Sequence, residues 1–197
     1  MKPKEVVEII EPKKIIVGNK KAPITITEFV DYESDECAKV NEVVAALLET
    51  YPDKINFNFR HFPLLKIHQK AHKAAEAAIA IGQEGGELLW EMHKELFRNR
   101  KNLGVISLKS YAKEIGTTNK KFLEDIINGT YGWTVQDDLN EGIKMGVTTV
   151  PTFFINGVMF DKEPTFKNLS AHIASLSDKA GDKKKVEVKK VKTASLN

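Results

Sequence analysis

A strand, a turn and a helix follow one another near the N-terminus and constrain the fold more than any other stretch. Residues 24–30 read ITITEFV, a β-branched and apolar run that is typical of a strand entering a covered sheet. After a turn at residues 31–33, apolar residues recur at three- and four-residue spacing up to Tyr51 and predict one buried helix face. Residues 55–62 alternate with period two and end at Pro63, which predicts a second strand. Strand, helix and strand within about forty residues predict a βαβ unit with parallel strands and a right-handed crossover.

The middle of the chain reads as helices only, and sheet signals return after it. Helical patterns interrupted by glycine continue through residues 66–145. Residues 147–155 predict a strand, Asn156-Gly157 a hairpin turn, residues 158–160 another strand and residues 165–176 a last helix. The expected fold is therefore α/β with an all-helical insertion, whose helices we predict at residues 71–81, 88–97, 108–115, 120–127 and 133–145.

Length and charge predict one domain with extensions at both ends. A chain of 197 residues is long enough to bury a core, and we expect the domain at residues 15–176. Residues 1–14 predict either an added edge strand or a loose extension. Residues 177–197 hold seven lysines and three acidic residues, a local charge of +4 that leaves −1 for the rest of the chain. The folded part thus gives no argument for nucleic acid, and we expect the tail to be flexible and solvated, a contact with an acidic surface being the alternative.

Several classes of protein and site are disfavoured by the residue content. The single cysteine, Cys37, excludes an internal disulfide framework and a cysteine-based zinc cluster. His68 and His72 have the spacing of metal ligands on a helix, but no third ligand supports them, so we expect no metal and interpret them as polar positions near a helix start. No run approaches the about eighteen apolar residues of a membrane span. We interpret Trp90 and Trp133 as packing residues of the insertion.

Several motifs, taken in their order along the chain, resemble those of the DsbA-like family of thioredoxin-fold proteins. Residues 18–32 resemble the stretch that leads to that family's active site, residues 60–64 (RHFPL) and 90–93 (WEMH) resemble its second strand and its insertion, and residues 146–157 (GVTTVPTFFING) resemble its cis-proline loop. The similarity covers roughly residues 16–176. It implies a thioredoxin fold, built from βαβ and ββα units around a helical insertion. It also implies thiol–disulfide exchange with protein substrates, a redox partner protein and no cofactor.

The resemblance places a C-x-x-C motif at the start of the first helix, where this chain has Ser34 and Cys37. In such proteins the first cysteine attacks as a thiolate, stabilised by the helix N-terminus, and the second resolves the mixed disulfide. Ser34 therefore stands at the attacking position and Cys37 at the resolving one. By the same resemblance, Pro151 forms the substrate loop with a cis bond after Val150, whose backbone would pair with an extended substrate. A serine cannot hold a disulfide, so the dithiol cycle is not available to this chain.

Three interpretations of Ser34 stay open. As a structural N-cap, its hydroxyl accepts a hydrogen bond from the N–H of Cys37. As an introduced Cys-to-Ser change, it disables an oxidoreductase whose shape is kept. As a working group, it holds the thiol of glutathione, as in kappa-class glutathione transferases and chromene-carboxylate isomerases, although Asp35 and Glu36 would disfavour a bound thiolate. Cys37 faces the core with the apolar side of the helix, which predicts an unreactive thiol; a mixed disulfide or a sulfenic acid is the alternative.

Three function classes follow from these interpretations. The first is a member of the DsbA-like oxidoreductase family that acts on protein thiols or disulfides and whose cycle is disabled by Ser34. The second is a non-catalytic module that holds extended peptides in a groove at Pro151, and the third is a glutathione-dependent transferase or isomerase. Family members are usually exported to the periplasm or cell envelope. The charged residues 1–14 show no export signal, so we expect a protein that stays inside the cell or has already lost its signal.

Overall fold

Five strands form one mixed sheet in the order β1-β3-β2-β4-β5 in the computed structural model, which describes residues 15–177. β2 and β3 are parallel, as predicted for the βαβ unit, and the other neighbouring strands are antiparallel. The molecule therefore has the thioredoxin fold that the sequence predicted. The strands are β1 (Val17–Gly18), β2 (Ile24–Val30), β3 (Ile55–His61), β4 (Thr152–Ile155) and β5 (Val158–Met159).

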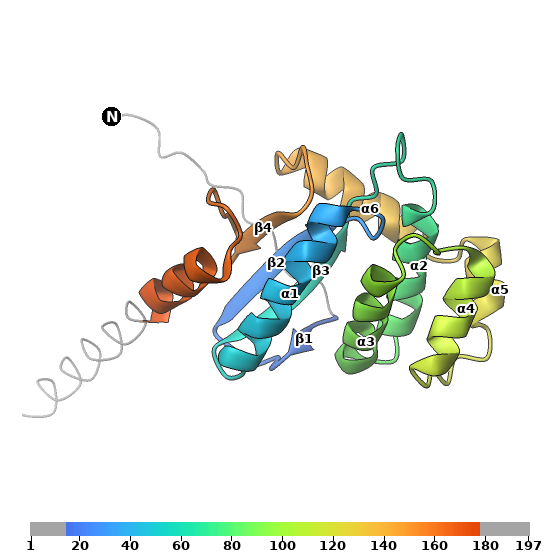
Figure 1. Cartoon of the computed structure of the whole chain (residues 1–197), viewed down its shortest axis with the longest axis horizontal. Helices are drawn as coiled ribbons and strands as arrows, with labels where there is room; N and C mark the ends of the chain where they lie inside the picture. The colour runs from blue at the N-terminus through green and yellow to red at the C-terminus, as the bar shows by residue number, and fades with distance from the viewer. Residues whose placement is uncertain (1–14, 178–197) are drawn as a thin grey trace, which may run out of the picture.

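The helices are present where the periodicity predicted them, and each begins and ends within three residues of the expected position. Figure 1 shows α1 lying across one face of the sheet, while α2 to α5 are grouped beside it. α3 contacts β1 and α6 contacts β3, which joins the insertion to the sheet. The helices are α1 (Asp35–Thr50), α2 (Ala71–Gly82), α3 (Gly86–Arg98), α4 (Val105–Glu114), α5 (Phe122–Asn128), α6 (Gly132–Lys144) and a last helix at residues 166–177.

The strand predicted at residues 147–155 is wrong in its first half, because β4 begins only at Thr152. Residues 147–151 form a loop, and Pro151 within it has no N–H to donate to a neighbouring strand. The predicted hairpin turn is confirmed: Asn156 and Gly157 both have positive φ, 48° and 81°, as a type I′ turn requires.

Both faces of the sheet are covered, so even the polar residues Thr27 and Glu28 of β2 are buried. Six of its seven residues are buried. α1 buries Cys37, Val44 and Leu47, which recur at helical spacing, and the last helix buries Leu169 and Ile173. The expectations for residues 1–14 and 178–197 lie outside the described residues.

The two tryptophans differ in their surroundings. Trp90 is half-buried and stacks on Phe59 of β3, with ring centroids 5.9 Å apart and an angle of 6° between the planes. Trp133 is 82% exposed, so its interpretation as a packing residue was wrong. The buried face of α6 contains Val135, Asp138 and Gly142. Trp133 precedes Val135 by two residues and thus lies about 200° away around the helix.

Candidate functional site

Ser34 is the N-cap of α1, as one interpretation of the sequence required. Its Oγ accepts a hydrogen bond from the N–H of Cys37 at 3.2 Å, and its hydroxyl donates to Oε2 of Glu36 at 3.3 Å. Ser34 is only 3% exposed. The hydroxyl is thus engaged as both donor and acceptor within the first turn of the helix, an arrangement that suits a helix cap.

Cys37 lies one turn into α1 and is completely buried, which confirms the prediction that it faces the core. The pKa of the Cys37 thiol is raised to about 12, chiefly by burial and secondly by the nearby acidic group of Glu28, against weaker opposing hydrogen bonds from Asp31 and Ser34. Because a thiolate is the reactive form, this thiol is a poor nucleophile at neutral pH.

Glu28 is a buried carboxyl group within β2, three residues before the turn that leads to Ser34. The residue is 1% exposed, and neither carboxyl oxygen has a hydrogen-bond partner in the described part of the chain. Burial raises the pKa of Glu28 well above its ordinary value. Glu28 was not predicted as a site residue, although a single acid within a strand that is buried on both faces is a visible signal in the sequence.

The turn before Ser34 is fastened to the loop that precedes α2 by two carboxylates. Oδ2 of Asp31 accepts hydrogen bonds from the N–H of Leu64 at 2.7 Å and from Nδ1 of His68 at 2.8 Å. Oε2 of Glu33 accepts from the N–H groups of residues 70 and 71 at 2.7 and 2.9 Å. His68 does lie before a helix, as expected, but its partner Asp31, 37 residues away, was not predictable from local sequence.

A second group of buried polar side chains contacts the same turn through Tyr32. The hydroxyl of Tyr32 is 3.0 Å from Nδ1 of His93 on α3, and Nδ1 of His61 is 3.0 Å from Oδ2 of Asp138 on α6. Nε of Arg60 donates to Oδ1 of Asp138 at 2.6 Å. Burial holds the pKa of His93 well below its ordinary value, so this imidazole is neutral. These contacts were not predicted from the sequence, because they join residues that are more than sixty positions apart.

Pro151 lies at the same end of β2 as Ser34. The bond between Val150 and Pro151 is cis. β2 and β4 pair Phe29 with Thr152, so the antiparallel register sets Pro151 beside Val30, the last residue of β2. The backbone of Val150 makes no hydrogen bond within residues 15–177. The structure therefore brings the residues singled out from the sequence to one end of the sheet.

Carboxylates dominate the charge around Ser34. Asp35 forms an ion pair with Arg100, which holds the pKa of Asp35 below its ordinary value, and Glu36 accepts from Ser34 itself. Within the described residues, no group of three His, Cys, Asp or Glu side chains could hold a metal ion. None of the helices described is long and apolar enough to cross a bilayer.

This fold and this site define the class of the protein: a thioredoxin fold with a DsbA-like helical insertion, a helix N-terminus and a cis-proline loop facing the same end of the sheet. A family model described as thioredoxin matches residues 11–175, and the chain belongs to that family.

Solved structures resemble the chain over most of its length. BdbD from Bacillus subtilis, in its oxidised form, has a TM-score of 0.75 at 19% identity over 86% of this chain and 97% of BdbD. α-DsbA1 from Wolbachia pipientis has a TM-score of 0.75 at 24% identity over 89% of this chain and 96% of its own. At these identities, the similarity shows a shared DsbA-like fold.

The curated relatives are longer proteins, named as Na⁺/H⁺ antiporters. A Na⁺/H⁺ antiporter NhaA from Salinispora arenicola is 31% identical over 158 residues, which are 80% of this chain and 24% of the antiporter. NhaA from Herminiimonas arsenicoxydans is 28% identical over 142 residues, 72% of this chain and 22% of that protein. The chain therefore spans about a quarter of the length of these relatives.

Proposed function

We propose that this chain is a DsbA-like protein that binds extended segments of proteins carrying thiols or disulfides, and that Ser34 blocks its dithiol cycle. The DsbA-like fold and the convergence of Ser34, Cys37 and Pro151 at one end of the sheet support this proposal. Ion transport is not part of it, because the match to the antiporters covers only about a quarter of their length.

The position of Ser34 carries the proposal. In the dithiol cycle, a thiolate at this position forms an S–S bond to a substrate sulfur and releases the other substrate sulfur as a thiolate. The hydroxyl of Ser34 cannot form that bond, and it is already engaged by the N–H of Cys37 and by Glu36. Cys37 is no replacement, since it is buried and its pKa of about 12 keeps it protonated.

The reversion Ser34→Cys tests the proposal directly. We expect it to convert a chain without activity into one that reduces insulin in the presence of dithiothreitol, because the new thiol lies at the helix N-terminus with Cys37 one turn behind. Ser34→Ala is the matched control and stays inactive. Adding Cys37→Ser to the revertant should trap mixed disulfides with substrate, visible as a thiol-sensitive band on a gel. A folded revertant without turnover contradicts the proposal.

Peptide binding without redox chemistry is the second candidate, and the free backbone of Val150 favours it. An extended segment can pair with the N–H and C=O of Val150. Fluorescence anisotropy with a labelled, cysteine-free peptide measures this binding. Affinity that is retained in Ser34→Ala and lost in Pro151→Ala supports a binding module.

The glutathione-dependent class remains the third candidate, with less support. The hydroxyl hydrogen of Ser34 is directed at the carboxylate of Glu36, and the charge of Asp35 lies beside it, so a glutathione thiolate would meet negative charge. Calorimetric titration with glutathione tests this class, since binding that disappears in Ser34→Ala would support it.

A further inference from the structure

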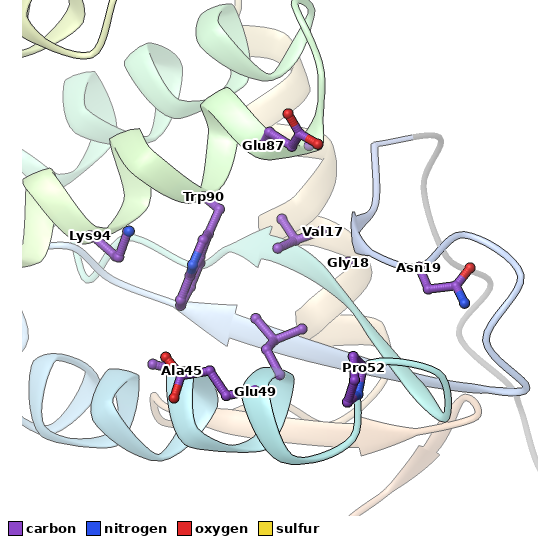
Figure 2. Close-up of a pocket in the computed structure, with 11 residues that line it drawn as sticks. Val17, Gly18, Asn19, Ala45, Glu49, Pro52, Glu87, Trp90 and Lys94 are labelled. Carbon is purple, nitrogen blue, oxygen red and sulfur yellow. The ribbon is translucent and has the colours of Figure 1, made fainter.

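A groove of about 370 Å³ separates α1 from α3 at the far end of α1 from Ser34. Figure 2 shows α1 with Ala45 and Glu49 on one side, α3 with Glu87, Trp90 and Lys94 on the other, and Val17 of β1 between them. Ala45 follows Ser34 by eleven residues, about 16 Å along a helix axis. The groove is therefore separate from the candidate functional site.

The inside of the groove is lined by apolar side chains, and stacking fixes the position of one of them. Val17, Leu48 and Pro52 line it together with the half-buried ring of Trp90. Stacking on Phe59 holds that ring in place. The space exceeds the about 150 Å³ cavity that is known to admit benzene, so it is large enough for more than one aliphatic side chain.

The rim of the groove is negatively charged. Glu49 on α1 and Glu87 on α3 are exposed, and neither forms an ion pair with a residue of the described range. The ammonium of Lys94, the cation of the groove lining, is already paired with Glu91 at 2.8 Å. A ligand that combines aliphatic side chains with positive charge fits this combination of an apolar interior and an acidic rim.

The end of β1 forms one side of the groove. β1 is an edge strand of the described sheet and pairs only with β3, so its other edge has no strand beside it. Gly18 and Asn19, at the end of β1, line the groove. The carbonyl of Asn19 accepts from the N–H of Ala22 at 2.9 Å and from Nδ2 of Asn56 at 3.0 Å, and α3 lies against β1. An extended ligand would therefore be held here by the side chains of the groove.

The chain itself contains a segment of this chemistry. Residues 183–192 read KKKVEVKKVK, with six lysines, one glutamate and three valines. Their net charge is +5, whereas the whole chain has +3, so all other residues together carry −2. Val186 and Val188 alternate with charged residues, so they would point to the same side of an extended segment.

The segment is close enough in the chain to reach the groove. Residues 178–192 span about 50 Å when extended. A compact unit of about 160 residues has a radius of gyration of about 15 Å, so this length crosses the molecule. In Figure 1 the last helix and α1 both run towards the lower left of the view.

We propose that the groove between α1 and α3 binds residues 183–192 of the same chain. Val186 and Val188 contact Trp90 and Leu48, and the lysines pair with Glu49 and Glu87. Tethering within one chain gives the segment an effective concentration of about a millimolar, so a weak intrinsic affinity is sufficient for occupancy. The valines are as necessary as the lysines, which distinguishes this binding from unspecific attraction of a basic tail.

Fluorescence of the full chain provides the first test. Trp133→Phe leaves Trp90 as the sole tryptophan and changes an exposed position. In this background, we expect Val186→Ser, Val188→Ser and Val191→Ser together to raise quenching of Trp90 by acrylamide by about twofold, since the occupant is lost without a change in charge. Unchanged quenching in the triple variant overturns the proposal.

The acidic rim is tested with a matched pair of variants. Glu49→Gln combined with Glu87→Gln should raise quenching in the same way, and salt should have the same effect on the parent chain. Glu42→Gln changes an exposed acid on α1 that does not line this groove and should leave quenching unchanged. Equal effects of both sets would mean that general charge attraction acts here and that the groove is not a specific site.

Carbodiimide cross-linking identifies the occupant. We expect isopeptide bonds, formed with loss of water, between the side-chain carboxyl of Glu49 or Glu87 and lysines of residues 183–192, found by mass spectrometry in the monomer band. The same links confined to a dimer band would assign the groove to a second copy and refute binding within one chain. Links spread evenly over all exposed acids would show a solvated tail, which also refutes the proposal.

Discussion

At the scale of single residues, Cys37 illustrates how burial determines the behaviour of a thiol near a helix start. Its pKa of about 12 leaves about one molecule in ten thousand ionised at pH 8. In the unfolded chain, the same thiol has an ordinary pKa near 8.5, so a substantial fraction is thiolate. The fold therefore protects the one cysteine of the chain from thiol chemistry.

This protection predicts a slow reaction with Ellman's reagent. At pH 8 we expect Cys37 to react about a thousandfold more slowly in the folded protein than in guanidinium chloride, because the thiolate fraction falls by that order. The absorbance of the released thiolate measures both rates. Stoichiometric labelling of the folded protein within minutes would show that Cys37 is accessible and ionised, contrary to its burial.

Glu28 predicts a pH dependence of stability with a definite sign. Folding raises the pKa of this carboxyl group, so above its ordinary value near 4.5 the folded state retains a proton that the unfolded chain has released. The associated stability is fully present at lower pH and is lost as the pH rises towards the pKa of the folded state. Glu28→Gln removes this titration and should become increasingly favourable, relative to the parent, between pH 5 and pH 8.

Urea unfolding of the parent and of Glu28→Gln at several pH values measures this difference. Glu42→Gln, on an exposed position of α1, serves as the control and should give a difference that does not change with pH. A constant difference for Glu28→Gln as well would mean that the pKa of Glu28 is not raised by folding.

At the scale of elements, α2 is capped by a residue from another segment. Lys70 occupies the N-cap position of α2 and makes no side-chain capping bond. The carboxylate of Glu33 accepts from the N–H groups of residues 70 and 71 instead, which also places negative charge at the positive end of the helix. The turn before Ser34 and the start of α2 are therefore stabilised together.

Loss of this cap should be measurable. We expect Glu33→Ala to lower the free energy of unfolding by about 1–2 kcal/mol, the usual cost of removing an N-cap acceptor. Glu33→Gln keeps an acceptor oxygen without the charge and should recover part of the loss. Urea unfolding measures both variants, and an effect of Glu33→Ala no larger than that of Glu42→Ala would contradict the capping role.

At the scale of the whole molecule, the insertion meets the sheet at a position that tolerates no side chain. Gly86, the first residue of α3, lies against the carbonyl oxygen of Ile16, just before β1, and an added Cβ would overlap that oxygen. α3 in turn provides Met92 and His93 to the centre of the protein. Close approach at Gly86 therefore fixes how the helical insertion sits on the edge of the sheet.

Gly86→Ala should push α3 away from the chain just before β1. We expect a loss of about 2–3 kcal/mol in the free energy of unfolding, because the added Cβ meets rigid backbone and α3 must move. Gly104→Ala is the control, since nothing lies within 4 Å of its added Cβ and its φ is −69°. Thermal unfolding monitored by circular dichroism compares the two, and equal stability would show that α3 adjusts freely.

Local signals were sufficient for the elements of the fold and for part of the site. The alternation in residues 55–62 and the helical spacing after Ser34 each operate over a few residues, so the strand and helix were predictable. Ser34 as a cap for Cys37 was also predictable, because the two are three residues apart. The start of β4 was missed, since strand propensity in residues 147–151 does not reveal where the chain leaves its neighbouring strand.

The sequence by itself determined the order of strands and helices, the position of Ser34 at a helix start and the lack of a second cysteine, since each depends on neighbours within one or two turns. The tertiary structure alone decided that Glu28 is buried without a partner, that Asp31 and Glu33 hold a loop more than thirty residues away, and that Trp133 faces solvent. Burial and long-range hydrogen bonds depend on which distant segments pack together, and no short stretch of residues specifies that packing.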